Sequence, residues 1–280
     1  MNDSLKLYVE KITNLPSLPA IAQKIIALAD DDLISVNKLE SIIGNDPAIS
    51  AKVLSVANSA FYGFHTPAKT LRNAIMRIGF NSVKNIALGI SIMTVLNAES
   101  RHITPDYERV FNHSVVVAFI SRLLSKRFKF STTDEIIISG ILHDIGMLVL
   151  SRYFHDDYLE VMNVFAEGKS LTDAEKEVFS FSHADIGNWI AVRWHLPDTV
   201  CDTVLHHHLP SGAAGDRLQI ATVHVADHIA DTHVFRATSQ DYVSPLDPSS
   251  LAVLGMSRDD LNDISAEIKN GSFFNDLFKT

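Results

Sequence analysis

The stretch that decides the fold is Asp134–Leu150, DEIIISGILHDIGMLVL. Apolar residues cover nearly every face of a helix drawn through it, so the sequence predicts a helix over about 133–151 that is buried on all sides. Yet His143 and Asp144 lie at its centre. Because a buried carboxylate without a partner costs several kcal/mol, Asp144 must meet a cation, an arginine or a proton. This pair is therefore the first candidate for a functional site.

The rest of the chain also follows the helical period, and no stretch is typical of a strand. We therefore expect an all-α, multi-helical bundle. Its expected helices, with ends accurate to ~2–4 residues, span 4–13, 19–30, 36–43, 47–57, 69–78, 82–97, 106–127, 133–151, 156–168, 172–180, 183–194, 198–208, 216–234 and 258–268. The polar, proline-bearing stretch 238–250 is expected to be a loop.

Local capping signals mark several helix starts. Asp46 precedes Pro47, which is the arrangement of an N-cap followed by proline at the first helical position. In a capping box, a hydroxyl and a carboxylate three residues later satisfy each other's backbone amides. Three pairs have this spacing: Thr132 with Glu135, Thr172 with Glu175, and Ser182 with Asp185.

The 280 residues suffice for one large domain or two modest ones. Histidines concentrate after residue 100, which predicts a division of labour along the chain. We expect an N-terminal helical packing half over 1–100 and a site-bearing helical half over 101–237. A loop and a helical tail are expected over 238–280.

Composition narrows the class of protein. Hydrophobic residues make up 46% and charged residues 20%, as in globular proteins. There is no uninterrupted apolar run of ~18 residues and no signal-peptide pattern, so we expect no membrane partner. The single cysteine, Cys201, excludes an internal disulfide and favours the cytoplasm. The net charge of −9 argues against nucleic acid as the main partner.

More polar residues interrupt apolar faces in the second half. Three lie on the apolar stripe of an expected helix: His113 in 106–127, His183 in 183–194 and Asp227 in 216–234. His207 and His208 close the helix 198–208, where the helix dipole favours a positive partner. Four further histidines of this half are expected at the surface or around the inward ones: His195, His224, His228 and His233.

Imidazoles and carboxylates on five packed helices are a ligand set for first-row divalent metals such as iron, manganese, zinc or nickel. Each residue alone also has an ordinary explanation. A core histidine is usually a hydrogen-bonded packing residue, Asp227 could pair with Arg217 or Lys84, and the run His206–His208 could be a solvated helix end. Their joint occurrence favours the metal site.

In this order, the residues resemble the HD superfamily of metal-dependent phosphohydrolases: a first helix histidine, the HD pair, later histidines and a final aspartate. Other segments are similar to the HDOD (HD-related output domain) family, and the similarity runs from about Leu15 to Asp227. These segments are LPSLPAIAQKIIALADDD, IIGNDPAISAKVLSVANSAFYGF, AIMRIGFNSVKNIALGI and HADIGNWIAVRWHLP.

The resemblance implies a set of metal ligands. Asp144 would be the bridging carboxylate if two ions bind, and it is the candidate catalytic residue. Counting from the segment 194–197 favours His207 with His208 over His206 with His207. The implied ligands are His113, His143, Asp144, His183, His207, His208 and Asp227.

Two departures bear on activity. Active cyclic-dinucleotide phosphodiesterases of the HD-GYP branch carry a lysine directly after HDIG, where this chain has Met147, and a GYP segment where this chain has Leu209–Gly212. Without the lysine, a cation that would stabilise phosphoryl charge is missing.

The resemblance therefore implies a cytoplasmic regulatory output module with a signalling protein partner, one or two bound metal ions and little or no catalysis. A nucleotide or phosphate ligand and an oligomer are left open. The alternative is an active phosphodiesterase or phosphomonoesterase, in which a metal pair would activate water and polarise a phosphoryl oxygen.

Overall fold

The computed structural model describes residues 3–12, 14–28, 33–97, 107–130, 135–235 and 243–270. Within these ranges the regular secondary structure is helical and there is no strand, which confirms the all-α prediction. The helices are α1 (Asp3–Lys11), α2 (Ala20–Ile26), α3 (Leu33–Gly44), α4 (Pro47–Ala57), α5 (Leu71–Ile78), α6 (Phe80–Asn97), α7 (Tyr107–Arg127), α8 (Ile136–Leu142), α9 (Ile145–Tyr153), α10 (His155–Ala166), α11 (Leu171–Phe179), α12 (His183–Arg193), α13 (Asp198–His206), α14 (Arg217–Ala230), α15 (Pro248–Leu254) and α16 (Arg258–Asn270), with the 3-10 turns η1 (Ala60–Tyr62) and η2 (Pro210–Gly212) and the π-helical turn η3 (Asp231–Phe235).

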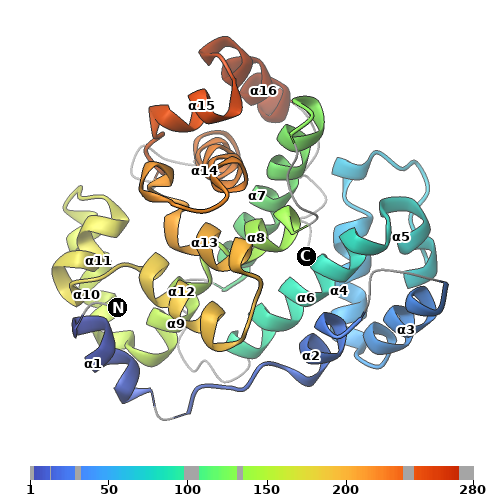
Figure 1. Ribbon diagram of the computed structural model, residues 1–280, viewed down its shortest axis with the longest axis horizontal. Helices are drawn as coiled ribbons and strands as arrows, with labels where there is room; N and C mark the ends of the chain where they lie inside the picture. Colours follow the sequence, from blue (N-terminus) through green and yellow to red (C-terminus); the bar gives the residue numbers. More distant parts are fainter. Residues whose placement is uncertain are drawn as a thin grey trace.

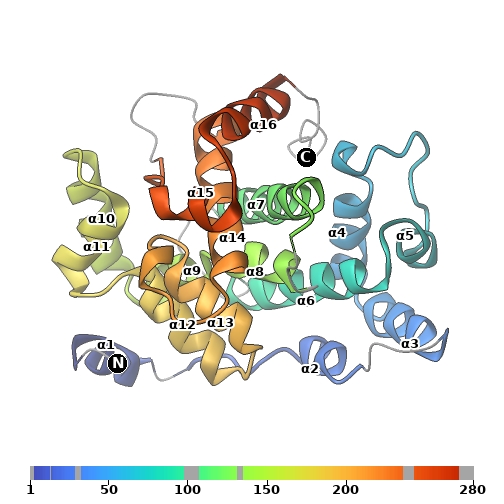
Figure 2. The same ribbon diagram turned by 45° about the horizontal axis from the view of Figure 1, so that its top comes forward.

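The helices form an elongated bundle, and α6 extends from one end of it to the middle (Figures 1 and 2). Helices α2 to α5 gather at one end, and α10 and α11 lie at the other. Helix α1 is separated from α2 and lies beside α10 and α11. There the ring of Tyr8 packs edge-on against Phe154, Phe179 and Phe181, with ring centroids 4.9, 5.2 and 5.4 Å away. The first helix thus covers the site-bearing part of the chain, while the predicted boundaries near 100 and 237 stay predictions.

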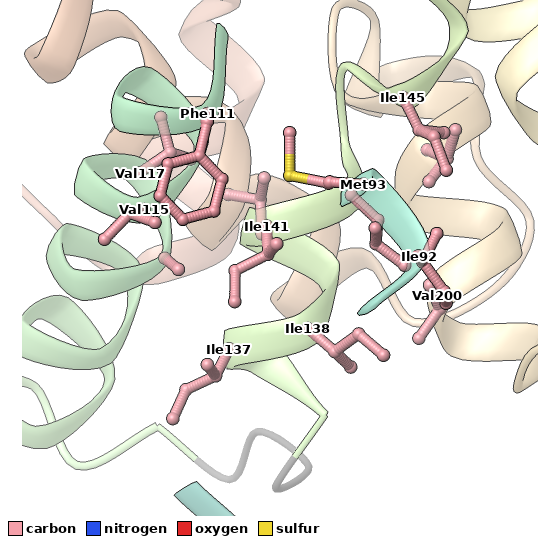
Figure 3. Close-up of a cluster of buried hydrophobic side chains, with 14 of the residues drawn as sticks. Ile92, Met93, Phe111, Val115, Val117, Ile137, Ile138, Ile141, Ile145 and Val200 are labelled. Carbon is pink, nitrogen blue, oxygen red and sulfur yellow. The ribbon is translucent and has the colours of Figure 1, made fainter. Parts of the chain in front are cut away.

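Buried apolar side chains of α6, α7 and α8 form one cluster of the core (Figure 3). Every residue of α8 is buried, as expected for a helix that is apolar all round. A Cβ on Gly140 would lie 2.5 Å from Cα of Ala118, so α8 approaches α7 at a distance that glycine alone allows. The stretch Ile136–Tyr153 is long and apolar enough to cross a membrane, but 83% of it is buried inside the fold, as in a core helix.

Two of the capping predictions are confirmed. The Asp46 carboxylate accepts the backbone amides of Ala48 and Ile49 at 3.0 Å, directly ahead of the proline that begins α4. Ser182 and Asp185 form the capping box that starts α12. Both signals are local, so they act regardless of how the helices pack.

The capping box predicted for Thr172 and Glu175 is wrong. Helix α11 begins one residue earlier than expected, and Ser170 is its N-cap, with its hydroxyl accepting the amide of Asp173 at 3.1 Å. Glu175 is therefore free to point into the protein. The pair that includes Thr132 lies outside the described residues.

The predicted helix over 133–151 is broken at the HD pair. Helix α8 ends at Leu142 and α9 begins at Ile145, with His143 and Asp144 in the turn between them. The break lets α9 approach α12 so closely that a Cβ on Gly146 would lie 1.9 Å from the carbonyl oxygen of His183. Packing against α12 thus overrides the helical propensity of the segment.

The C-terminal part contains two further differences. The predicted loop over 238–250 ends earlier, because α15 begins at Pro248 with Asp247 as its N-cap. Asp247 and Pro248 carry the same Asp-Pro signal as Asp46 and Pro47. The predicted helix over 216–234 ends as the π-helical turn η3, a form that often occurs at functional sites.

Candidate metal centre

The seven residues predicted to bind metal converge from elements far apart in the sequence. Helix α7 contributes the first histidine, the α8–α9 turn contributes the HD pair, and α12 and α14 contribute His183 and Asp227. His207 and His208 lie just after α13, which ends at His206. Their side chains form two groups, in each of which the potential ligand atoms lie within 4.8 Å of one another. The groups are Asp144 with His183, His207 and His208, and His113 with His143 and Asp227.

Asp144 lies between the two groups. Its Oδ2 is 3.2 Å from Nε2 of His143 and 3.8 Å from Nε2 of His113. Its Oδ1 is 3.3 Å from Nε2 of His183 and 3.4 Å from Nε2 of His207. Each carboxylate oxygen thus faces a different group, which is the arrangement of a bridging carboxylate.

The second carboxylate belongs to one group alone. Oδ1 of Asp227 lies 3.0 Å from Nε2 of His113 and 3.6 Å from Nε2 of His143. Arg217 and Lys84, considered above as its partners, form hydrogen bonds elsewhere. Arg217 donates to the carbonyl of Ala213, and Lys84 donates to the carbonyl of Leu28 just after α2. Within the described ranges, the ion pairs of both acids are made with histidines.

Hydrogen bonds behind the rings orient three of the histidines. Nδ1 of His143 donates to the carbonyl of Gly140 at 2.8 Å, and Nδ1 of His207 donates to that of Val204 at 2.7 Å. Nδ1 of His183 donates to the carboxylate of Glu175 at 2.8 Å. Because these partners only accept, the proton lies on Nδ1 and, in the neutral ring, Nε2 presents its lone pair to the centre.

The contacts between Nε2 atoms fit a bound cation. Nε2 of His183 lies 2.9 Å from Nε2 of His208 and 3.4 Å from Nε2 of His207. Facing lone pairs repel, so a proton or a cation must lie between such atoms. Nε2 of His143 is buried and lies 3.2 Å from Oδ2 of Asp144. Imidazole and carboxylate donors of this kind suit a divalent first-row metal.

The electrostatics keep the acids ionised and some imidazoles neutral. Burial alone would raise the pKa of Asp144, but the charge and hydrogen bond of His143, with those of other histidines, hold that pKa well below its usual range. The pKa of Asp227 is likewise held low against burial by hydrogen bonds from His113 and His143. Burial and the neighbouring histidines hold the pKa of His208 well below its usual range. Against burial, Asp144 and Asp227 raise the pKa of His143 well above its usual range, and Glu175 with Asp144 raises the pKa of His183 to about 10. A metal ion would displace these ring protons, since anionic oxygens and neutral nitrogens are the forms that bind metal.

Sequence reasoning missed two acids beside the ligands. Glu175 is fully buried and hydrogen bonds with His183. Asp231 has Oδ1 3.6 Å from Nδ1 of His113, and burial together with the charge of Asp227 raises its pKa to about 7. Asp231 lies four residues after Asp227, so helical spacing could have identified it. No local signal marks Glu175.

Ser244, in the segment that precedes α15, also contacts residues of the site. The amide of Ser244 donates to Asp231 at 2.8 Å, its hydroxyl lies 3.2 Å from Nδ1 of His208, and its carbonyl accepts from His228 at 2.7 Å. His224 donates to the carbonyl of His207 at 2.6 Å. His224 and His228 therefore lie around the ligands, as predicted.

Comparisons with known proteins agree with this fold. A family model described as the HDOD domain matches residues 15–210. The structure of an HDOD domain protein of unknown function from Geobacter sulfurreducens is 21% identical, with a TM-score of 0.83 over 99% of this chain and 98% of that one. A protein from Shewanella amazonensis SB2B, named a candidate phosphohydrolase, is 22% identical, with a TM-score of 0.73 over 96% of each chain.

Two further relatives are more distant or longer. A protein from Marinobacter aquaeolei VT8, named a candidate signal transduction protein, is 19% identical with a TM-score of 0.73 over 98% of this chain and 63% of that one. An uncharacterized protein of Treponema pallidum is 23% identical over 225 residues. That match covers 78% of this chain and 42% of the relative, so this chain spans less than half of the relative's length. At these identities, the structural likeness establishes the fold alone.

Proposed function

The chain belongs to the HDOD family, and on that premise we propose that it is a regulatory output module of cytoplasmic signal transduction whose buried histidine–aspartate cluster binds one or two divalent metal ions, with little or no catalysis. One observation carries the proposal. Two buried carboxylates held as anions lie among five imidazoles, and within the described ranges their ion pairs include no lysine or arginine. A metal ion among the rings would balance that charge in place of the ring protons.

Each group would hold one ion, and Asp144 would contribute one oxygen to each. The donor chemistry fits iron, manganese, zinc or nickel, since imidazole and carboxylate suit all four. A metal bound there would supply Lewis acidity toward a phosphoryl oxygen. The chain's own residues would orient the nitrogens through their outer hydrogen bonds and exclude water by their burial.

Two features support weak or absent hydrolysis. Met147, at the position of the phosphate-facing lysine of active HD-GYP enzymes, packs against the hydrophobic core. The side chains of Asp144 and His113 are 12% and 11% exposed, and His208 is half-buried. The other four ligands are buried more deeply. A phosphodiester would therefore meet little accessible surface at the cluster and no lysine from this position.

A signalling protein would bind the helical surface formed by α2 to α5, which lies away from the cluster. The name of the Marinobacter relative, a candidate signal transduction protein, supports this class of role. Metal occupancy, or a phosphate-bearing ligand at the cluster, would set the conformation that the partner recognises.

The second candidate function is metal-dependent phosphohydrolysis. It is favoured by the two oxygens of Asp144 facing two ligand groups, because a shared carboxylate would hold two ions near each other, as two-metal hydrolysis requires. The name of the Shewanella relative, a candidate phosphohydrolase, points the same way.

One preparation tests both candidates. The protein is purified without chelator or affinity tag, its metal content is measured by elemental analysis, and a generic phosphodiester and a cyclic dinucleotide are assayed. We expect metal in the wild type, none in Asp144→Ala, and no turnover. Turnover that Asp144→Ala abolishes and the surface variant Glu160→Ala retains would favour the hydrolase. A wild type that binds no added iron, manganese, zinc or nickel would contradict both.

A further inference from the structure

Resting on the metal site proposed above, we propose that Glu175 is a positioning residue for the ligand group of Asp144, His183, His207 and His208. Its carboxylate holds the proton of His183 on Nδ1 and aims Nε2 at the metal. The carboxylate, histidine and metal would then form a relay that strengthens this group's hold on its ion.

Glu175 forms hydrogen bonds with both the ring and the backbone of His183. Oε1 and Oε2 of Glu175 lie 2.9 and 2.8 Å from Nδ1 of His183, and Oε2 also accepts the backbone amide of His183 at 2.8 Å. The carboxylate is fully buried. One side chain thus fixes both the ring and the backbone of His183, which leaves little freedom for Nε2 to turn away from Asp144.

Two other ligand rings donate from Nδ1 to neutral backbone carbonyls, which are weaker acceptors than a carboxylate. His143 and His207 each donate to a carbonyl three residues earlier in the chain, Gly140 and Val204. Charge-assisted hydrogen bonds are about twice as strong as neutral ones. A carboxylate behind His183 therefore makes its Nε2 a better electron donor than a carbonyl would. Nε2 of His183 also lies 2.9 Å from Nε2 of His208, another ligand of the same group.

Glu175 could instead serve only to cap α12, because it accepts the amide of that helix's first residue. A purely structural role predicts that its loss lowers the stability of the metal-free protein and leaves the metal affinity of the folded protein unchanged. A positioning role predicts a change in affinity. Metal binding therefore separates the two.

The test compares Zn²⁺ affinity by competition with a chromophoric chelator in four proteins: wild type, Glu175→Gln, Glu175→Leu and Glu177→Gln. Removing an outer-shell partner lowers metal affinity roughly 10–100-fold. We expect about 10-fold weaker binding in Glu175→Gln, which keeps an accepting oxygen, and about 100-fold in Glu175→Leu. Glu177→Gln is the matched control on the same helix, where the side chain is 50% exposed and pairs with Lys169, and it should bind as the wild type does.

The outcomes are distinct. Wild-type affinity in a folded Glu175→Gln protein overturns this inference and leaves the metal site intact, whereas a wild type that binds no metal removes the metal site itself. A measurement on the wild type does not depend on the variants' folding. In ¹⁵N–¹H spectra of the histidine rings, the Zn²⁺-loaded protein should show the proton of His183 on Nδ1, and a proton on Nε2 would overturn the relay.

Discussion

Gly146 lies where the start of α9 meets the start of α12. A Cβ at this position would stand 1.9 Å from the carbonyl oxygen of His183 and 2.9 Å from the amide nitrogen of Gly187. These are backbone atoms, which cannot turn away as a flexible side chain can. The absence of a side chain therefore sets how near Asp144, two residues earlier, comes to His183.

Gly146→Ala should destabilise the protein by about 3 kcal/mol, at the upper end of the usual cost of overpacking, because α9 and α12 must separate. The same shift should weaken metal binding. Urea denaturation followed by circular dichroism measures the stability, and elemental analysis measures the metal.

The matched control is Gly44→Ala, since a Cβ there meets no atom within 4 Å. Its stability should stay within about 0.5 kcal/mol of the wild type. Equal effects of the two substitutions would show that the close approach at Gly146 does not constrain the fold.

Among elements, α1 has the least expected position. It packs on the part of the protein formed by α9 to α11, through the ring of Tyr8, while the hydroxyl of Tyr153 and the indole of Trp194 donate to the carbonyls of Asn14 and Pro16 just after it. Helix α1 and the residues after it thus pack against α9 to α12, and α12 carries His183. Sequence periodicity predicted the helix but not what it would pack against.

Tyr8→Ala should destabilise the protein by about 2 kcal/mol, less than the roughly 3–5 kcal/mol lost when a fully buried aromatic ring is removed, because Tyr8 is only partly buried. Leu7→Ala is the control on the same helix, where the side chain is 61% exposed, and it should have little effect. Thermal denaturation of both variants measures how much stability each substitution removes. If the two lose equal stability, the aromatic contact contributes nothing specific.

At the scale of the whole molecule, the cluster ties together helices that are far apart in the chain. His113 and Asp227, which share a 3.0 Å contact, are 114 residues apart. A metal held by both groups would cross-link α7, α12, α13 and α14 with the α8–α9 turn. Since the unfolded chain does not preserve this arrangement, binding should favour the folded state.

Removal of metal should therefore lower the unfolding temperature. Free metal at 100 times its dissociation constant stabilises a fold by about 2.7 kcal/mol, which corresponds to about 5–10 °C in a chain of this size. Differential scanning calorimetry with and without added Zn²⁺ measures the shift. Asp144→Asn should unfold at the same temperature in both conditions, and a metal-independent wild type would contradict the proposed site.

Much of the local structure was predictable because its causes are local. Asp46 and Ser182 begin helices through hydrogen bonds to amides two or three residues away, and those bonds form whatever the rest of the chain does. The inward orientation of His113 likewise follows from its place on an apolar stripe. For the same reason, an all-helical fold could be inferred before any packing was known.

Packing decided what sequence patterns left ambiguous. The break at His143 and Asp144 arises from the contact of α9 with α12. Glu175, whose spacing from Thr172 also suited a capping box, instead hydrogen bonds with His183 on the next helix. The sequence by itself determined the helices and the residue types of the candidate site. Only the tertiary structure decided which oxygen faces which imidazole, because those distances depend on side chains that are brought together from distant parts of the chain.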